Sequence, residues 1–248
     1  MLYLFYIQKT DISLDNTLNK INDKIFNTAL ELSGENLSYE KALKMLNSDK
    51  DVELQIAILN ITEIKSTEDA LLLTNKLTGQ DGKIREVCAF KLRELALNPK
   101  FRQFFINEDI FKTWQNGFLD INGNICRMVV ELTQIVEFKQ YLAKHLPNKI
   151  CEIIEEIKPM DLTSKQYLLS KKNFWLYWTL EALSNCSDFV EFDKIKDILE
   201  YCADFVDYPI REKAAKIVRN YNAKNANTIR QKLCQDENFY VRLVLKEN

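Results

Sequence analysis

The chain has 248 residues, of which 46% are hydrophobic and 28% charged, and its 34 Lys and Arg nearly balance 36 Asp and Glu for a net charge of −2. This balance argues against a protein that coats nucleic acid, because such proteins carry a clear excess of basic residues. Only five glycines and four prolines are present, which is low for a sheet-rich protein with many tight turns. The composition favours a chain that is helical over nearly its whole length.

The first seven residues, MLYLFYI, form the one strongly apolar run of the sequence. The run lacks a basic lead region, is far shorter than a membrane span, and is followed by the polar residues Gln8, Lys9 and Asp11, so a secretion signal is disfavoured. We expect it to pack against a first helical stretch over residues 14–32. Residues 1–37 are therefore predicted to form an N-terminal capping segment.

A short helical phrase then recurs six times. Its copies begin at Asp49, Asp81, Asn122, Lys172, Asp207 and Asn238. Each copy places a large apolar residue three positions later and continues as an apolar stripe at helical spacing. A short side-chain oxygen accepts a hydrogen bond from an otherwise unpaired N–H in the first turn of a helix. The phrases predict six helix starts, with Asn173 as the capping residue of the copy that begins at Lys172.

The spacing of the phrases indicates a repeat protein. Successive copies are 32, 41, 50, 35 and 31 residues apart, close to the roughly 30 to 50 residues of a helical repeat unit. Further amphipathic segments lie between them, over residues 37–46, 68–77, 101–118, 150–157, 192–205 and 226–233. Each unit is thus predicted as helix A, turn, helix B. Pro99, Pro147, Pro159 and Pro209 are expected at helix beginnings or between helices.

Two phrases carry a fuller motif, and a third copy is truncated. The copies are Asp81, Ile84, Arg85, Cys88, Ala89; Asp207, Ile210, Arg211, Ala214, Ala215; and Val241, Arg242. This pattern resembles the second helix of the HEAT-repeat family, although Glu53, Cys126 and Leu176 replace the Arg in the other units. The resemblance implies an all-α, right-handed α-α superhelix of about six HEAT-like helix pairs, continuous over residues 38–248. It also implies that the Asp and Arg make contacts between neighbouring repeats.

The residues that usually carry catalysis or bind metal are sparse. Six cysteines are spaced 16 to 38 residues apart with no CxxC pair, and His145 is the single histidine. Cys88 and Cys186 lie in apolar stripes, which favours buried free thiols and a reducing, cytoplasmic setting. No glycine-rich phosphate loop or nucleophile elbow is present. We predict a protein that is not an enzyme, with no cofactor, no metal and no membrane span.

Helix geometry suggests a binding surface. Residues two, five, six and nine positions beyond the apolar residue of each phrase should face away from helix A, into a concave groove. The candidate partner-binding residues are Glu86, Arg93, Arg127, Glu131, Gln134, Tyr177, Glu181, Glu212, Lys216 and Arg219. The other groove positions are Leu54, Ile58, Ile61, Phe90, Leu180 and Ser184. The carboxylates interrupt any basic track, so a protein or peptide partner is predicted in preference to nucleic acid.

Other interpretations remain open. The groove positions can be ordinary solvated residues, with the binding surface elsewhere. Trp175 and Trp178 are expected in the core and Tyr177 on the opposite side. Trp175 and Trp178, with Glu181 nearby, are similar to the residues with which helical-repeat alkylpurine DNA glycosylases hold a damaged base, although the basic groove of those proteins is missing here. A third alternative is a phycobilisome lyase-type protein that handles a tetrapyrrole.

The charge distribution and the end of the chain raise two further possibilities. Residues 150–208 carry a net charge of −6 and residues 209–248 a net charge of +5. The basic end suggests a docking surface or a small anionic contact, or only chance variation between the ends of a solenoid. The last unit is short and its flank includes Val244 and Leu245, so self-association through this repeat is possible.

Overall fold

A computed structural model describes residues 37–163 and 165–246, with residues 223–225 described by their backbone alone. Regular structure in these ranges is entirely helical, with twelve α-helices and five short 3₁₀ helices. The predicted all-α class is confirmed. The predicted N-terminal capping segment falls, except for Leu37, outside the described residues and stays a prediction.

The helices follow one another as six pairs. These are α2 (Tyr39–Met45) and α3 (Asp51–Asn60), α4 (Thr67–Thr74) and α5 (Gly82–Leu97), α6 (Glu108–Gly117) and α7 (Gly123–Glu131), α8 (Val136–Ile157) and α9 (Tyr167–Asn185), α10 (Lys196–Ala203) and α11 (Tyr208–Arg219), α12 (Ala223–Cys234) and α13 (Phe239–Val244). The 3₁₀ helices are η1 (Asn75–Thr78), η2 (Arg102–Phe105), η3 (Leu132–Gln134), η4 (Ser187–Phe189) and η5 (Phe192–Lys194).

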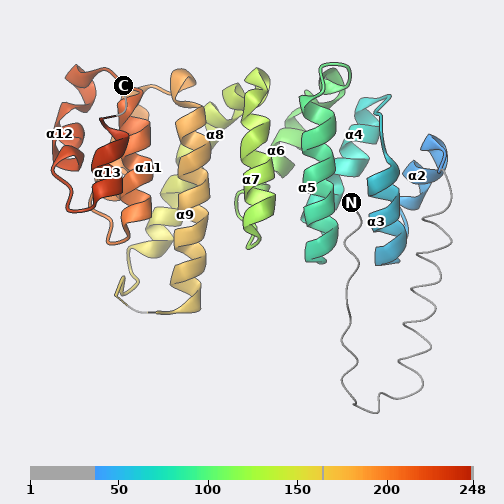
Figure 1. Cartoon of the computed structure of the whole chain (residues 1–248), viewed down its shortest axis with the longest axis horizontal. Coiled ribbons are helices and arrows are strands. Elements are labelled where there is room, and N and C mark those ends of the chain that lie inside the picture. The colour runs from blue at the N-terminus through green and yellow to red at the C-terminus, as the bar shows by residue number, and fades with distance from the viewer. Residues whose placement is uncertain (1–36, 164, 247–248) are drawn as a thin grey trace, which may run out of the picture.

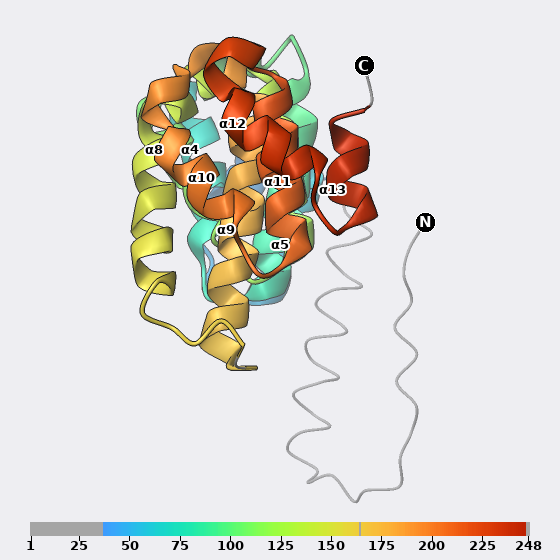
Figure 2. The same ribbon diagram turned by 90° about the vertical axis from the view of Figure 1, so that its left-hand side faces the viewer.

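The pairs stack into an α-solenoid. The second helices of the pairs, α3, α5, α7, α9, α11 and α13, each contact the next one along the chain and form one row (Figure 1). The first helices from α4 to α12 contact one another in a second row. Viewed from the C-terminal end, the two rows appear as two layers (Figure 2). The predicted arrangement of helix A, turn and helix B is therefore correct for all six units.

A continuous core fills the space between the two rows. Its largest fully buried side chains include Trp114, Phe105, Phe118 and Phe138. The Trp114 and Phe138 rings meet edge to face with centroids 5.2 Å apart, a geometry that favours aromatic pairs. A helical repeat cannot bury its apolar stripe alone, so each unit depends on its neighbours for this core.

Most of the predicted helix starts are correct. Asp81 accepts from the N–H of Lys83 and of Ile84 at 2.8 Å each, and Asn122 and Asn238 cap α7 and α13 in the same way. The prediction for Asp49 was wrong, because α3 begins two residues later and Lys50 occupies the capping position without a side-chain hydrogen bond. Asp207 stands at the capping position of α11, but its side chain makes no capping bond.

The predicted start at Lys172 was also wrong. Helix α9 begins five residues earlier, at Tyr167, and Asn173 lies inside it. The helix extends upstream because Leu169 adds a buried residue to its apolar stripe. Instead of capping, Asn173 donates from Nδ2 to Oδ2 of Asp207 on the next pair, at 2.8 Å.

Helix α8 is longer than predicted and contains Pro147. It starts at Val136, and α7 ends at Glu131. An interior proline costs about 3 kcal/mol, whereas each fully buried large apolar side chain contributes about 1.5–3 kcal/mol. The buried side chains of Phe138, Leu142 and others on both sides of Pro147 explain why the helix continues through it. Pro209 lies in the first turn of α11, as predicted.

Candidate partner-binding surface

Nine of the ten candidate partner-binding residues lie on α5, α7, α9 and α11, and Gln134 lies in η3, directly after α7. We call this row the B-helix surface. Arg93 on α5 forms an ion pair with Glu131 on α7. Glu86 on α5 accepts hydrogen bonds from the side-chain amides of Asn122, at 3.1 Å, and Asn124, at 2.6 Å. The structure therefore brings these predicted residues together across the α5–α7 contact. The same ion pair and hydrogen bonds also hold the second and third repeats together.

Glu181 is the centre of a second cluster on this surface. Its carboxylate lies 2.5 Å from Nζ of Lys216 and 3.0 Å from Nζ of Lys213, both on α11. Burial alone would raise the pKa of Glu181, but the two ammonium groups outweigh it and hold the pKa below its ordinary value. Lys213 also lies over the ring of Tyr177, 4.6 Å from its centroid. The predicted residues Tyr177, Glu181 and Lys216 thus come together between α9 and α11.

The other predicted residues differ in accessibility. Arg127 and Gln134 are exposed, and Glu212 is half-buried. Arg219 donates from Nη1 to the carbonyl of Val244 beside α13, at 3.2 Å. That any of the ten candidate residues contacts a partner stays a prediction.

The predicted helix phase was wrong at two places. Ile58 and Ile61 are fully buried in and after α3, and Leu180 and Ser184 are buried in α9. Helix α9 contacts α7, α8 and α11, so more than one of its faces is covered. Trp175 and Trp178 pack only partly buried against the core, as does Tyr177. The expected opposition between the tryptophans and Tyr177 is therefore not seen.

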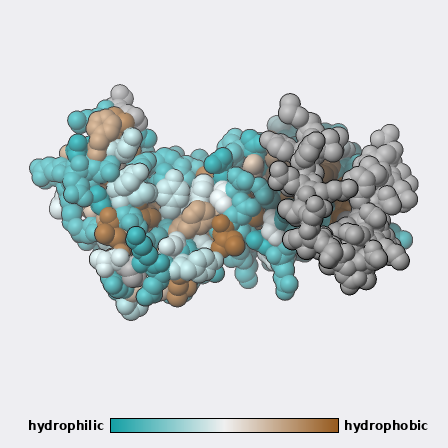
Figure 3. Space-filling view, turned by 60° about the horizontal axis from the view of Figure 1, so that its bottom comes forward, coloured by the Kyte–Doolittle hydropathy of each residue, from teal (hydrophilic) through white to brown (hydrophobic). Residues whose placement is uncertain are grey.

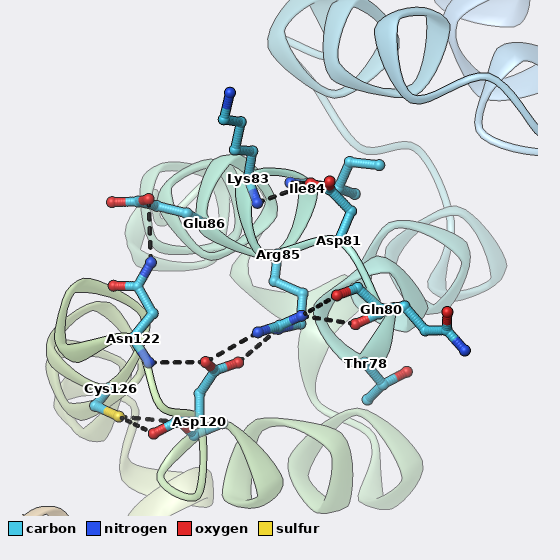
Figure 4. A network of polar contacts seen from close by, with 12 residues as sticks. Thr78, Gln80, Asp81, Lys83, Ile84, Arg85, Glu86, Asp120, Asn122 and Cys126 are labelled. Carbon is cyan, nitrogen blue, oxygen red and sulfur yellow. Dashed lines mark hydrogen bonds and ion pairs between the residues drawn. The ribbon is translucent and has the colours of Figure 1, made fainter.

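Two arginine joints, which we define here, connect neighbouring units. At the Arg85 joint, Arg85 contacts Asp120 of the next unit through Nε–Oδ2 at 2.6 Å and Nη2–Oδ1 at 3.2 Å (Figure 4). Its Nη1 donates to the carbonyls of Gly79 and Gln80, in the turn that precedes α5. The predicted contact between repeats is correct for the Arg. Asp81 instead caps its own helix.

The Arg211 joint repeats this geometry near the C-terminal end. Arg211 contacts Asp236 through Nε–Oδ2 at 2.7 Å and Nη2–Oδ1 at 3.1 Å, and donates to the carbonyls of Phe205 and Val206. Sequence reasoning missed the two acceptor aspartates. A signal was present, because Asp120 and Asp236 each stand two residues before a capping Asn.

Part of the basic end of the chain pairs with the acidic segment that precedes it. Lys213 and Lys216 pair with Glu181, and Lys232 pairs with Asp204. Arg230 donates to three main-chain carbonyls that follow or end α11. The opposite net charges of residues 150–208 and 209–248 therefore meet within the molecule.

Sequence reasoning also missed a cleft of about 690 Å³ at the N-terminal ends of α9 and α11. Its lining residues are Ser170, Asn173, Phe174, Tyr177, Val206, Asp207, Tyr208, Pro209, Ile210, Arg211, Glu237 and Asn238. We call it the C-terminal cleft. The view from the lower side of the molecule shows apolar side chains exposed among polar ones (Figure 3). No local motif marks the cleft, because three units contribute to it.

The cysteines and other candidate metal ligands are dispersed. Cys88 and Cys186 are buried free thiols, as predicted, whereas Cys151 and Cys234 are exposed. Burial raises the pKa of Cys186 to about 12, so this thiol stays protonated at neutral pH. Within residues 37–163 and 165–246, no three His, Cys, Asp or Glu side chains gather as a metal site. In the same ranges no helix combines the length and apolarity needed to cross a membrane.

Comparison with known proteins gives structural similarity alone. The sequence matches no protein-family model and no curated protein. A designed armadillo repeat protein is similar in structure with 15% sequence identity and a TM-score of 0.44, over 84% of this chain and 97% of that one. An engineered protein from a structural genomics consortium is similar with 15% identity and a TM-score of 0.46, over 84% of this chain and 93% of the other. The helix contacts of the chain itself define it as a helical repeat solenoid.

Proposed function

We propose that this chain is a non-catalytic scaffold that binds a partner protein or peptide on its B-helix surface. The observation that carries the proposal is the alternation of charge along the row, with Arg93 beside Glu131 and Glu181 beside Lys213 and Lys216. Because α5, α7, α9 and α11 lie next to one another, one partner segment can contact several units at once.

Apolar groups beside these charges favour a polypeptide ligand. The Phe90 ring is exposed on α5, one turn from Glu86 and Arg93. A peptide or helix uses apolar contacts together with charges of both signs, whereas a phosphate backbone requires a continuous row of cations. Glu86, Glu131 and Glu181 interrupt such a row. Nucleic acid is therefore the less favoured ligand.

We also propose that the chain is related to HEAT-repeat proteins and that it is located in the cytoplasm. The arginine joints at Arg85 and Arg211 support the relation, since the residues of the HEAT-like motif make them. The free thiols of Cys88 and Cys186 support the setting, because thiols stay reduced in the cytosol.

The test is selection of peptides that bind the whole chain. A displayed library of random peptides is panned against the immobilised protein, and the affinities of the selected sequences are measured by calorimetry. Two variants, Arg127→Glu and Phe90→Ser, should weaken binding of peptides that use this surface. Both side chains are exposed, so the melting temperature should change little.

The matched control is Lys112→Glu. Lys112 is exposed on α6, in the row of first helices, and its reversal changes the net charge as Arg127→Glu does. The proposal fails when panning selects no binder. It also fails when the selected peptides bind Arg127→Glu and Phe90→Ser as tightly as the unchanged chain.

A further inference from the structure

The C-terminal cleft is bordered by exposed aromatic rings. Tyr208 at the start of α11 is 41% exposed and Tyr240 on α13 is 58% exposed. Their rings stack with centroids 6.2 Å apart and planes inclined by 25°. Phe239, also exposed, meets Tyr240 edge to face. Phe174 and Tyr177 line the cleft from α9. Such a group of exposed rings is typical of an interaction site, since large aromatics are otherwise mostly buried.

The accessible charge at this cleft is negative. Asp207 and Glu237 line it, and the Glu237 side chain is 90% exposed. Arg211 lines it too, but its side chain is 10% exposed, Asp236 binds it through two hydrogen bonds, and its Nη2 also lies 3.4 Å from Oε1 of Glu237. Asp207 makes no side-chain cap on α11 and instead accepts from Asn173. The lining thus holds two carboxylates and a single, mostly buried guanidinium that Asp236 already binds, which leaves the cleft with a net negative charge.

We infer that the C-terminal cleft binds an Arg or Lys side chain presented by a partner protein. A cation over an aromatic face is attracted by the ring, and a neighbouring carboxylate strengthens the contact. Tyr208, which lines the cleft and stacks with Tyr240, supplies the ring face, and Asp207 and Glu237 supply the carboxylates. Arginine suits the site better than lysine, because its planar guanidinium stacks on rings and bonds carboxylates with two N–H groups. This inference rests on the proposed function and adds the charge class of the partner.

The same charges disfavour the other occupants. An acidic segment would place like charges beside Asp207 and Glu237. A wholly apolar segment would cover these carboxylates without pairing them, which costs free energy. A second copy of the chain, joined through Phe239 and Tyr240, is an alternative that the experiment separates.

The probe is a fluorescein-labelled peptide of seven residues in which glycine and arginine alternate. Its binding to the full chain is followed by fluorescence anisotropy, and a second peptide carries citrulline in place of each arginine. Citrulline keeps the shape and removes the charge, so the citrulline peptide should bind about tenfold more weakly or worse. Equal binding of the two peptides overturns the inference.

Variants locate the contact. Asp207→Asn combined with Glu237→Gln should weaken the arginine peptide about tenfold. Asn keeps an oxygen that can accept from Asn173, so α9 and α11 should stay joined. The matched control combines Asp193→Asn with Glu200→Gln, which removes two exposed charges near and on α10. An equal loss in the control shows general attraction of charge and overturns the inference.

The contribution of the Tyr208 ring is tested separately. Tyr208→Phe keeps the aromatic face and should retain binding, whereas Tyr208→Leu should lose it several-fold. Light scattering of the unchanged chain and of Tyr240→Ala tests for a second copy in the cleft. The inference is overturned if the unchanged chain forms a dimer that Tyr240→Ala dissociates and the arginine peptide does not bind. If peptides selected from the library bind the chain and their affinity is the same for every variant of this cleft, the inference fails and the proposed function stands. When no peptide binds anywhere, the proposed function fails.

Discussion

The Arg85 and Arg211 joints contrast with the joint between the third and fourth units. In the first two, a guanidinium binds the carbonyls of its own turn and an Asp of the next unit. In the third unit Cys126 stands in place of the Arg, and its Sγ lies 3.5 Å from the carbonyl oxygens of Gly117 and Asp120. The Cys126 thiol can donate to the carbonyls of its own turn, but its side chain is too short to reach the next repeat.

Aromatic packing replaces the polar contact at that joint. Phe174 and Trp178 of α9 approach the backbone of Gly123 at the start of α7. One hydrogen bond, from Asn185 to Thr133 at 3.0 Å, accompanies them. The comparison teaches that repeats of one chain can be joined either by a buried ion pair or by apolar contact. Loss of the Arg from the motif therefore does not break the stack.

The largest effect is expected from breaking the Arg211 joint. Arg211→Met should destabilise the chain by about 3–5 kcal/mol, because Asp236 would remain buried without its cation. Urea unfolding measures the loss. Arg242→Met is the control, since Arg242 donates to the carbonyls of Asp236 and Glu237 without pairing a buried carboxylate. Equal small losses in both variants would show that the ion pair does not hold the last two units together.

A smaller effect tests the apolar packing of the third unit. Gly117→Ala should cost about 1–3 kcal/mol, because a Cβ there would lie 2.8 Å from Cγ2 of Val129. Gly123→Ala is the matched control. Its Cβ would meet the Phe174 ring at 3.6 Å, an ordinary contact, so its unfolding temperature should change little. A stable Gly117→Ala protein would contradict the tight packing of α6 on α7.

The contact between α9 and α11 that is centred on Glu181 depends on pH. The two lysines hold the pKa of Glu181 below its ordinary value of 4.5. The ionised pair therefore stabilises the fold above that pH, and its contribution disappears as pH falls through the folded-state pKa. Glu181→Gln should cost about 1–2 kcal/mol at neutral pH, and the difference from the unchanged chain should shrink in acid. Unfolding curves across this range measure it, and a constant difference would contradict the assignment.

The smallest effect compares two helix starts. Asp81→Ala should cost about 1 kcal/mol, because Asp81 accepts from two first-turn N–H groups of α5. Asp207→Ala should cost less at its own helix, because Asp207 caps nothing and gives up only an exposed bond from Asn173. Thermal unfolding of the two variants makes the comparison. A larger loss for Asp207→Ala would show that the contact between α9 and α11 matters more than a cap.

The positions that sequence reasoning placed correctly obey local rules. Asp81, Asn122 and Asn238 cap helices because the bonds lie within three residues of chain. The errors at Lys172 and Pro147 come from competition between a local signal and burial. Leu169 extends α9 upstream of the apparent start. The buried residues around Pro147 carry α8 through a residue that usually ends a helix. Tertiary packing decided both cases.

The candidate site was only partly predictable for the same reason. The B-helix residues Glu86, Arg93, Tyr177 and Glu181 were placed on the right row, because helical periodicity determines side-chain direction where one face is buried. Their partners Asn124, Glu131 and Lys216 depend on how two helices pack, which periodicity within one helix does not determine. The C-terminal cleft was missed because Phe174, Tyr208 and Glu237 come from three different units.

The sequence by itself determined the all-α class, the six helix pairs and most helix starts, because these follow from periodicity and capping over a few residues. Only the tertiary structure decided which aspartate each arginine meets, where α8 and α9 begin, and that aromatic rings and two carboxylates share one cleft. Those features depend on distances between residues about 25 to 35 positions apart in sequence, and such distances are set by the packing of whole helices against one another.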